Sequence, residues 1–179
     1  TMYDCCNSIL KPKGTCPETI PVSFNSISKW PNCINPIGNQ GDCGSCWAFS
    51  AAQILGDRHC ISKNLGSVLS LSPQFQVSCD RVNLGCSGGW LDKTWSFLAT
   101  TGIPTSSCVP YSGKNGVCPN KCANNSPLAY YKSVNALRLR STDLPAIQRE
   151  ILKYGPIQAG FTVYTDFFYY KSGVYSHKT

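Results

Sequence analysis

Twelve cysteines in 179 residues constrain this chain more than any other feature of its sequence. Reducing compartments rarely hold so many thiols, so the count favours an oxidising compartment and a fold held by several disulfides. Structural zinc is the competing interpretation, but zinc sites usually combine two close ligand pairs. Here Cys-x-x-Cys occurs once, at Cys43 and Cys46, and His59 and His177 stand far apart. We therefore expect disulfides, and neither a metal nor a cofactor.

The overall composition is that of a globular protein with a mildly cationic surface. Hydrophobic residues make up 42% of the chain, and the formal net charge is +7. No apolar run reaches the roughly 18 residues that suggest a membrane span. The basic residues are scattered rather than arranged in a stripe with interleaved aromatic residues. We expect neither a membrane span nor nucleic-acid binding.

Local signals predict helices in the first two thirds of the chain and strands near its end. Caps, apolar spacing and stop residues indicate four helices, at about 45–58, 72–79, 89–102 and 141–155. Residues 20–44 and 103–127 are rich in loop-forming residues. The residue patterns of 130–139 and 156–164 predict strands. In the second strand, alternation places four apolar residues on one side: Ile157, Ala159, Phe161 and Val163. A helical, disulfide-rich half thus precedes a half that begins to form β-structure.

The sequence Cys43-Gly-Ser-Cys46 lies where the first long helix is expected to begin. A redox pair of the thioredoxin type would need a preceding strand, which this loop does not supply. A disulfide between the two neighbours is sterically poor here. The third interpretation separates them: Cys43 bonds elsewhere and Cys46 stays free. Unpaired N–H groups and the helix dipole would then favour a nucleophilic thiolate at Cys46.

Four motifs follow one another along the chain: QGDCGSCWAFSA, LSPQFQVSCD, GCSGGW and YGPIQAGFTVYTDFFYYKSGVYSH. Their order and spacing resemble those of papain-like cysteine proteases, and of the cathepsin B-like subgroup in particular. The first contains the Cys-Gly-Ser-Cys-Trp signature around the nucleophile of these enzymes. The resemblance covers about residues 20–179, which is nearly the whole chain.

The resemblance implies an α+β fold with two lobes. Residues 20–123 would form the helical, disulfide-rich left lobe with the nucleophile helix. Residues 124–179 would form the first part of an antiparallel β-barrel right lobe, which is incomplete in this sequence. Residues 1–19 are interpreted as an N-terminal extension and a propeptide remnant.

The resemblance also assigns roles to individual residues. Cys46 would be the catalytic nucleophile, and Gln40 would help to form the oxyanion hole. Four further residues would contact the substrate: Gly88 and Gly89 along the cleft wall, and Leu91 and Gly160 around a side-chain pocket. The implied disulfides are Cys33–Cys60, Cys43–Cys86, Cys79–Cys118 and Cys108–Cys122. Cys5, Cys6 and Cys16 receive no partner from the family pattern.

The two histidines do not satisfy the need for a catalytic imidazole. His59 is thirteen residues beyond Cys46 on the same expected helix, which places it about 20 Å away. The surroundings of His177 resemble the stretch before the catalytic histidine of the family rather than the Gly-His-Ala setting of that histidine. We therefore expect the catalytic histidine, and the asparagine that orients it, to come from polypeptide beyond residue 179.

Two functions remain open on the sequence. The first is a thiol endopeptidase of the secretory pathway, in a lysosome, a digestive vacuole or outside the cell. It would act on peptide and protein substrates and be blocked by a propeptide or by cystatin-like inhibitors. The second is a catalytically inactive protease-like binding or structural protein.

Two departures from the family pattern bear on function. Cathepsin B carries a long loop with histidines that lets it remove dipeptides from carboxyl ends. Only nine residues separate Cys108 from Cys118 here, and none of them is histidine, which favours endopeptidase action. Asp42 stands where the family usually has a small residue, and we expect it to face water.

Overall fold

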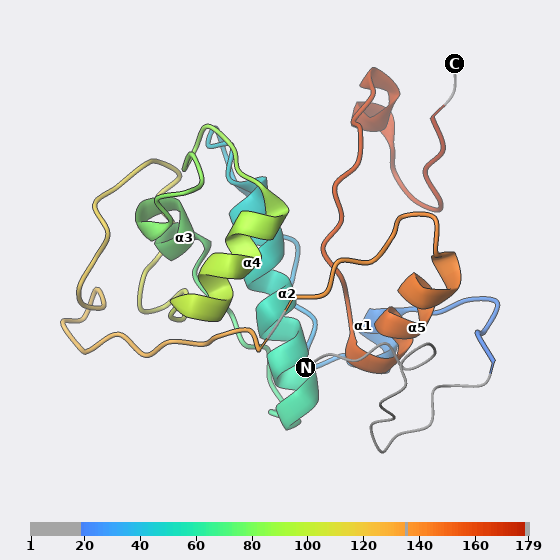
Figure 1. Ribbon diagram of the computed structural model, residues 1–179, viewed down its shortest axis with the longest axis horizontal. Coiled ribbons are helices and arrows are strands. Elements are labelled where there is room, and N and C mark those ends of the chain that lie inside the picture. Colours follow the sequence, from blue (N-terminus) through green and yellow to red (C-terminus); the bar gives the residue numbers. More distant parts are fainter. Residues whose placement is uncertain (1–18, 135, 178–179) are drawn as a thin grey trace.

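The computed structural model describes residues 19–134 and 136–177, and helices are its regular elements (Figure 1). The helices are α1 (Ser26–Lys29), α2 (Cys46–Lys63), α3 (Pro73–Cys79), α4 (Leu91–Thr100) and α5 (Leu144–Tyr154), with a 3-10 helix η1 (Thr165–Tyr169). Helices α2, α3 and α4 gather on one side of the view, together with the loop that follows α4. Helix α5 and the C-terminal segment lie on the other side. The expectations for residues 1–18 lie outside the described residues.

Helix α2 is longer than its sequence predicted. We expected an end near Arg58, but the helix continues to Lys63. The extra turn contains neither glycine nor proline, so nothing in it interrupts the helix. The helix ends where Asn64 takes a left-handed conformation with φ 50°, which asparagine tolerates better than most residues.

Helices α3, α4 and α5 confirm the capping signals. The Ser72 side chain accepts a hydrogen bond from the N–H of Phe75 at 3.0 Å, and a proline opens α3. Asp143 caps α5 by accepting from the N–H of Ala146 at 3.1 Å. Just past the end of α4, Gly102 has φ +79°, and a Cβ there would lie 2.7 Å from a backbone oxygen. Only glycine fits this position.

Two apolar clusters hold α2 against α3 and α4. The larger cluster buries Ala51, Ala52, Leu55, Leu71, Phe75, Leu98, Ile103 and Val109. The smaller cluster contains Cys43, Trp47, Ala48 and Val77, so it lies directly under the first turn of α2. The start of α2 is therefore anchored in the core while its outer face stays accessible.

The two strands expected at 130–139 and 156–164 are not formed in the described residues. Pairing there consists of isolated bridges, of which one joins Ile103 to Tyr131 with reciprocal 2.9 Å hydrogen bonds. A strand forms only when a second segment pairs with it along its length. An alternating pattern is a property of one segment and does not show that such a partner exists. The expected first part of a β-barrel is accordingly not formed within residues 124–134 and 136–177.

Four disulfides reinforce this framework, and they are the four pairs that the family resemblance implies. They join Cys33 to Cys60, Cys43 to Cys86, Cys79 to Cys118, and Cys108 to Cys122. Within the described residues Cys46 alone is a free cysteine. Cys43 and Cys46 therefore have different chemical states although they are three residues apart.

Candidate active site

Cys46 is the first residue of α2 and is exposed to solvent. The residue before it, Ser45, makes no side-chain cap, so the first turn keeps unpaired donors. Among the described residues, no acceptor meets the backbone N–H of Cys46 or Trp47. Such a helix start attracts negative charge, and its N–H groups can bind an oxyanion.

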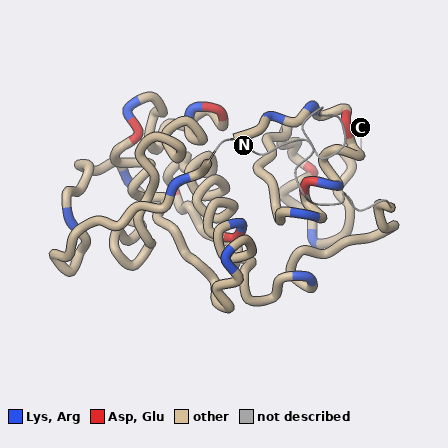
Figure 2. Tube along the Cα trace, turned by 60° about the horizontal axis from the view of Figure 1, so that its bottom comes forward, with Lys and Arg blue, Asp and Glu red and all other residues tan. Residues whose placement is uncertain are grey.

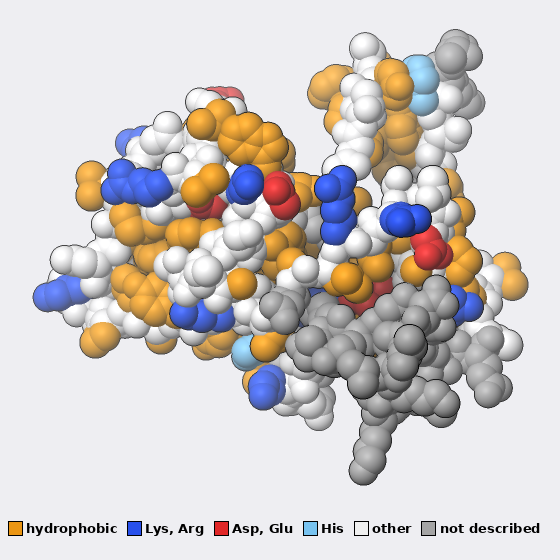
Figure 3. Space-filling model, viewed as in Figure 1, with side chains coloured by type: hydrophobic (Ala, Val, Ile, Leu, Met, Phe, Trp, Pro, Cys, Tyr) orange, Lys and Arg blue, Asp and Glu red, His pale blue; other side chains and the backbone are white. Residues whose placement is uncertain are grey.

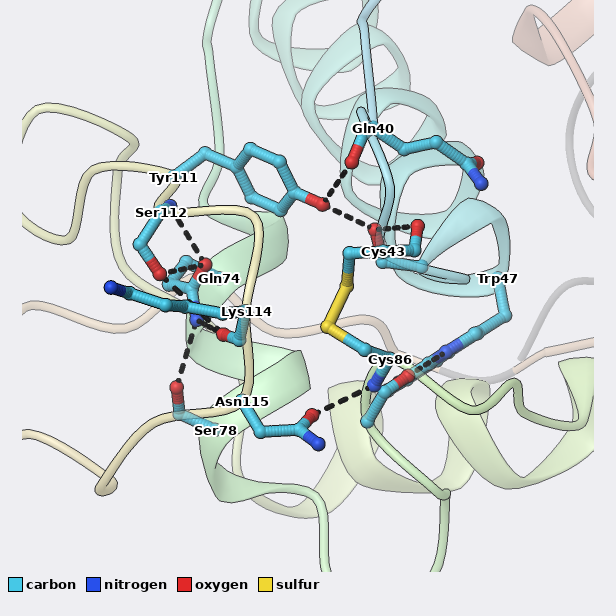
Figure 4. The surroundings of a disulfide bond; sticks show 12 residues. Gln40, Cys43, Trp47, Gln74, Ser78, Cys86, Tyr111, Ser112, Lys114 and Asn115 are labelled. Carbon is cyan, nitrogen blue, oxygen red and sulfur yellow. Dashed lines mark hydrogen bonds between the residues drawn. A yellow bond between two sulfur atoms is a disulfide. The ribbon is translucent and has the colours of Figure 1, made fainter.

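The turn before Cys46 is held rigidly against the segment around Cys86. The Cys43–Cys86 disulfide joins the two segments, and the N–H of Gly44 donates to the oxygen of Cys86 at 2.8 Å. A Cβ on Gly44 would lie 2.6 Å from that oxygen. On the other side, Asn115 accepts from the N–H of Cys86 at 2.8 Å (Figure 4). The backbone that presents Cys46 therefore has little freedom to move.

Gln40 is positioned through its backbone. The Tyr111 hydroxyl donates to the Gln40 oxygen at 2.8 Å and shares a 2.6 Å hydrogen bond with the hydroxyl of Ser45. Figure 4 shows the amide side chain of Gln40 extending on the opposite side of its backbone from Tyr111. Tyr111 thus couples the loop that carries Gln40 to the residue that precedes Cys46.

Gly88 and Gly89 lie on a loop that Asp80 and Asn83 shape. Asn83 is buried, donates to Asp80 at 2.7 Å and accepts from the N–H of Trp90 at 2.7 Å. A Cβ on Gly89 would lie 2.7 Å from both the Asn83 oxygen and the Trp47 ring. Among the hydrogen bonds of the described residues, none uses the backbone N–H or C=O of Gly89. An extended peptide could pair with these two groups.

Leu91 and Gly160 face each other although they are 69 residues apart. A Cβ on Gly160 would lie 3.8 Å from Cδ1 of Leu91, which is ordinary contact. Figure 3 shows a notch in the surface between the side that carries α2, α3 and α4 and the C-terminal segment. The structure therefore brings Leu91, at the start of α4, beside the segment that follows α5.

Neither described histidine is paired with Cys46. His59 is in the same helix as Cys46, and its ring packs edge-on against Tyr131. Burial, with a smaller effect of Lys63, lowers the pKa of His59 below its usual 6.5. His177 stacks on Tyr164 at 3.7 Å, and its Nδ1 lies 3.1 Å from the Asp166 carboxylate.

Two side chains that connect distant parts of the site were not identified from the sequence. Tyr111 reaches Gln40 across 71 residues, and Gln158 reaches Trp47 across 111 residues. A signal existed for Gln158, because strand-like alternation places it on the same side as Gly160. No comparable signal marked Tyr111, whose neighbours form an irregular loop.

Several other kinds of site find no support within the described parts of the chain. No group of three or more His, Cys, Asp or Glu is arranged to hold a metal ion. No described helix is both long enough and apolar enough to cross a membrane. Asp42 is exposed, as expected. Figure 2 shows the described Lys and Arg residues spread over both sides of the molecule.

Comparisons with known proteins identify the family of this chain. Residues 20–179 match the model of the papain family of cysteine proteases. Cathepsin B-like CP3 of Giardia intestinalis is 46% identical over 172 residues, which cover 93% of this chain and 57% of that protein. Cathepsin B of Dictyostelium discoideum is 39% identical over 178 residues, covering 89% and 57%.

A solved structure extends the similarity to the fold. The structure of procathepsin B S9 from Trypanosoma congolense superposes with a TM-score of 0.80 at 34% identity, covering 91% of this chain and 59% of that one. The present chain thus spans somewhat more than half the length of these relatives. These three relatives are cathepsin B or cathepsin B-like proteins by name, and the chain belongs to the papain family of cysteine proteases.

Proposed function

We propose that this protein is a thiol endopeptidase in which the Cys46 sulfur attacks the scissile carbonyl carbon. The carbonyl oxygen becomes an oxyanion, which the N–H of Cys46 and the side-chain amide of Gln40 stabilise. The tetrahedral intermediate collapses to a thioester as an imidazolium gives its proton to the leaving amine. Water then hydrolyses the thioester and restores the thiol.

The exposed, unbridged state of Cys46 is the observation that carries this proposal. Every other described cysteine is in a disulfide, and Cys46 alone lies at a helix start with unpaired N–H groups. A purely structural protein would not require this arrangement. The unpaired backbone of Gly89 supports the pairing of an extended substrate beside the sulfur, and Gly88 continues that wall. Leu91 and Gly160 would then border a pocket for a substrate side chain.

The catalytic imidazole has to come from elsewhere in the protein. His59 is excluded because the body of α2 separates it from Cys46. His177 is engaged with Asp166 and Tyr164. We therefore propose that polypeptide beyond residue 179 supplies the histidine and the asparagine that orients it, and packs onto residues 124–179 as the rest of the second lobe.

The direct test is thiol labelling of the full-length protein. An epoxide thiol probe is expected to label Cys46 at mildly acidic pH, and the wild type is expected to cleave a blocked fluorogenic peptide. Cys46→Ser should lose both labelling by the probe and cleavage of the peptide. Ser62→Ala, at the exposed far end of α2, should keep both. An unlabelled but folded wild type would instead favour a protein that binds without catalysis.

Endopeptidase action is the finer part of the proposal. The stretch between Cys108 and Cys118 is short and contains no histidine that could bind a substrate carboxylate. Peptides blocked at both ends should therefore be cleaved internally. Robust release of dipeptides from free carboxyl ends would contradict this expectation.

The proposed setting is a secretory, lysosomal or extracellular one. Four disulfides require an oxidising site of folding. Solved relatives described as procathepsins support association with a propeptide, which we propose occupies the groove before activation. Cystatin-like inhibitors would compete with peptide substrates for the same groove.

A further inference from the structure

Gln158 lies in the segment after α5 and contacts two other elements through its side-chain amide. Its Nε2 donates to the Trp47 oxygen at 3.1 Å and to the Ser50 hydroxyl at 2.7 Å, both in α2. Its Oε1 accepts from the Trp95 indole in α4 at 2.6 Å. An indole N–H can only donate and a carbonyl oxygen can only accept, so these partners fix the amide in one orientation.

The same contacts lead directly to the nucleophile. The Ser50 hydroxyl, which accepts from Gln158, donates to the carbonyl oxygen of Cys46 at 2.8 Å. The Trp47 oxygen, which also accepts from Gln158, belongs to the next peptide. One amide from a distant segment thus restrains two successive carbonyl groups in the first turn of α2, a turn that has no side-chain cap of its own.

We propose that Gln158 is a positioning residue that holds the Cys46 sulfur in register with the substrate groove. The proposal rests on the proposed thiol protease function. Two residues further on, Gly160 lies beside Leu91. The hydrogen bonds of Gln158 therefore set the distance between the wall at Gly160 and the helix start at Cys46.

This role predicts a specific kinetic signature. Both donors of the Gln158 amide are used within the protein, so they are not available to a substrate. Loss of the amide should slow the chemical steps, which depend on the placement of the sulfur, and should leave substrate binding nearly unchanged. The decrease should appear in kcat rather than in KM.

A carboxyl group at this position gives a second, pH-dependent signature. Ionised glutamate has no hydrogen to donate, and it would face the Trp47 carbonyl oxygen. Protonated glutamate can donate one hydrogen bond and restores part of the contact. Gln158→Glu should therefore approach wild-type kcat as the pH falls and lose activity as the pH rises.

The experiment compares Gln158→Met and Gln158→Glu with wild type in the full-length protein. We expect kcat of Gln158→Met to fall about tenfold, which corresponds to the loss of one to two hydrogen bonds, with KM within about twofold. The kcat of Gln158→Glu, divided by the kcat of wild type at the same pH, should rise toward one at acidic pH. Gln53→Glu is the matched control, because Gln53 also lies on α2 and donates to a carbonyl, that of Pro36, on the exposed side. The kcat of Gln53→Glu relative to wild type should not show this dependence on pH.

Rates of Cys46 alkylation by iodoacetamide, measured over the same pH range, separate the possible outcomes. The inference is overturned if both Gln158 variants keep wild-type kcat and alkylation rates at every pH. It is also overturned if kcat and KM deteriorate together without pH dependence, which would indicate a general loss of structure. Failure of the proposed function looks different: the wild-type thiol itself would be unreactive and no peptide would be cleaved. If Gln158→Met does not fold, the pH dependence of Gln158→Glu decides alone.

Discussion

Asp57 is a buried carboxylate whose hydrogen bonds do not offset the cost of its burial. It accepts from the backbone N–H of Asn35 at 2.8 Å and from the Asn35 side chain at 2.7 Å. Burial raises the pKa of Asp57 above its usual 3.8, although these two hydrogen bonds act in the opposite direction. The folded state therefore binds the proton more tightly than the unfolded chain does. This group favours folding at acidic pH, and its contribution is lost as the pH rises through the folded pKa.

Asp57→Asn tests this sign. The amide oxygen can still accept from Asn35, but the side chain no longer titrates. The free energy of unfolding of the variant, relative to wild type, should increase as the pH rises from about 4 toward neutrality. Urea unfolding at a series of pH values measures this difference. Ser62→Ala, an exposed substitution that changes no carboxylate, should give a flat profile. The assignment would be contradicted if the free energy of unfolding of wild type, relative to Asp57→Asn, increased with rising pH.

At the scale of elements, the helices were predictable because their signals are local. Ser72 and Asp143 cap their own helices within three residues, and Gly155 follows α5 with φ 102°. The strands at 130–139 and 156–164 were predicted wrongly because pairing depends on distant partners. Tyr131 finds one such partner in Ile103, and the bridge goes no further.

The N-cap of α3 offers a quantitative test of one element. The Ser72 hydroxyl accepts from the N–H of Phe75 and donates to the Val109 oxygen at 2.7 Å, and it is fully buried. Ser72→Ala should lower the free energy of unfolding by about 1–2 kcal/mol, because a cap and a buried hydrogen bond are lost together. Urea denaturation measures the change. An effect below about 0.5 kcal/mol, the level expected for the exposed Ser62→Ala, would show that the cap is not important.

At the scale of the whole molecule, part of the site was predictable and part was not. The place of Cys46 at a helix start followed from local signals, and its free state followed from the resemblance of the surrounding motif to the papain family. The contacts of Tyr111 and Gln158 join residues 71 and 111 positions apart, so they depend on packing between elements that sequence patterns do not specify. The sequence thus identified the candidate nucleophile, whereas the structure was needed to find the side chains that contact its turn.

The C-terminal segment carries large apolar side chains that are exposed to solvent. Phe168, Tyr169 and Val174 are 79%, 80% and 98% exposed, and Figure 3 shows apolar side chains gathered on this part of the molecule. Burying such side chains contributes about 1.5–3 kcal/mol each. This surface is consistent with our proposal that further polypeptide, carrying the catalytic histidine, packs against residues 124–179.

Two of the disulfides allow the stability of the whole molecule and the reactivity of Cys46 to be tested independently. Cys33–Cys60 and Cys43–Cys86 close stretches of 27 and 43 residues, so chain entropy predicts a similar cost of about 4 kcal/mol for removing either one. Only the second disulfide holds the turn before Cys46. The paired substitution of Cys43 and Cys86 by alanine should therefore slow Cys46 alkylation in the folded protein much more than that of Cys33 and Cys60. Unfolding midpoints and alkylation rates measure the two effects separately. Equal alkylation rates in the two variants would show that the rigidity of this turn is not what positions the sulfur.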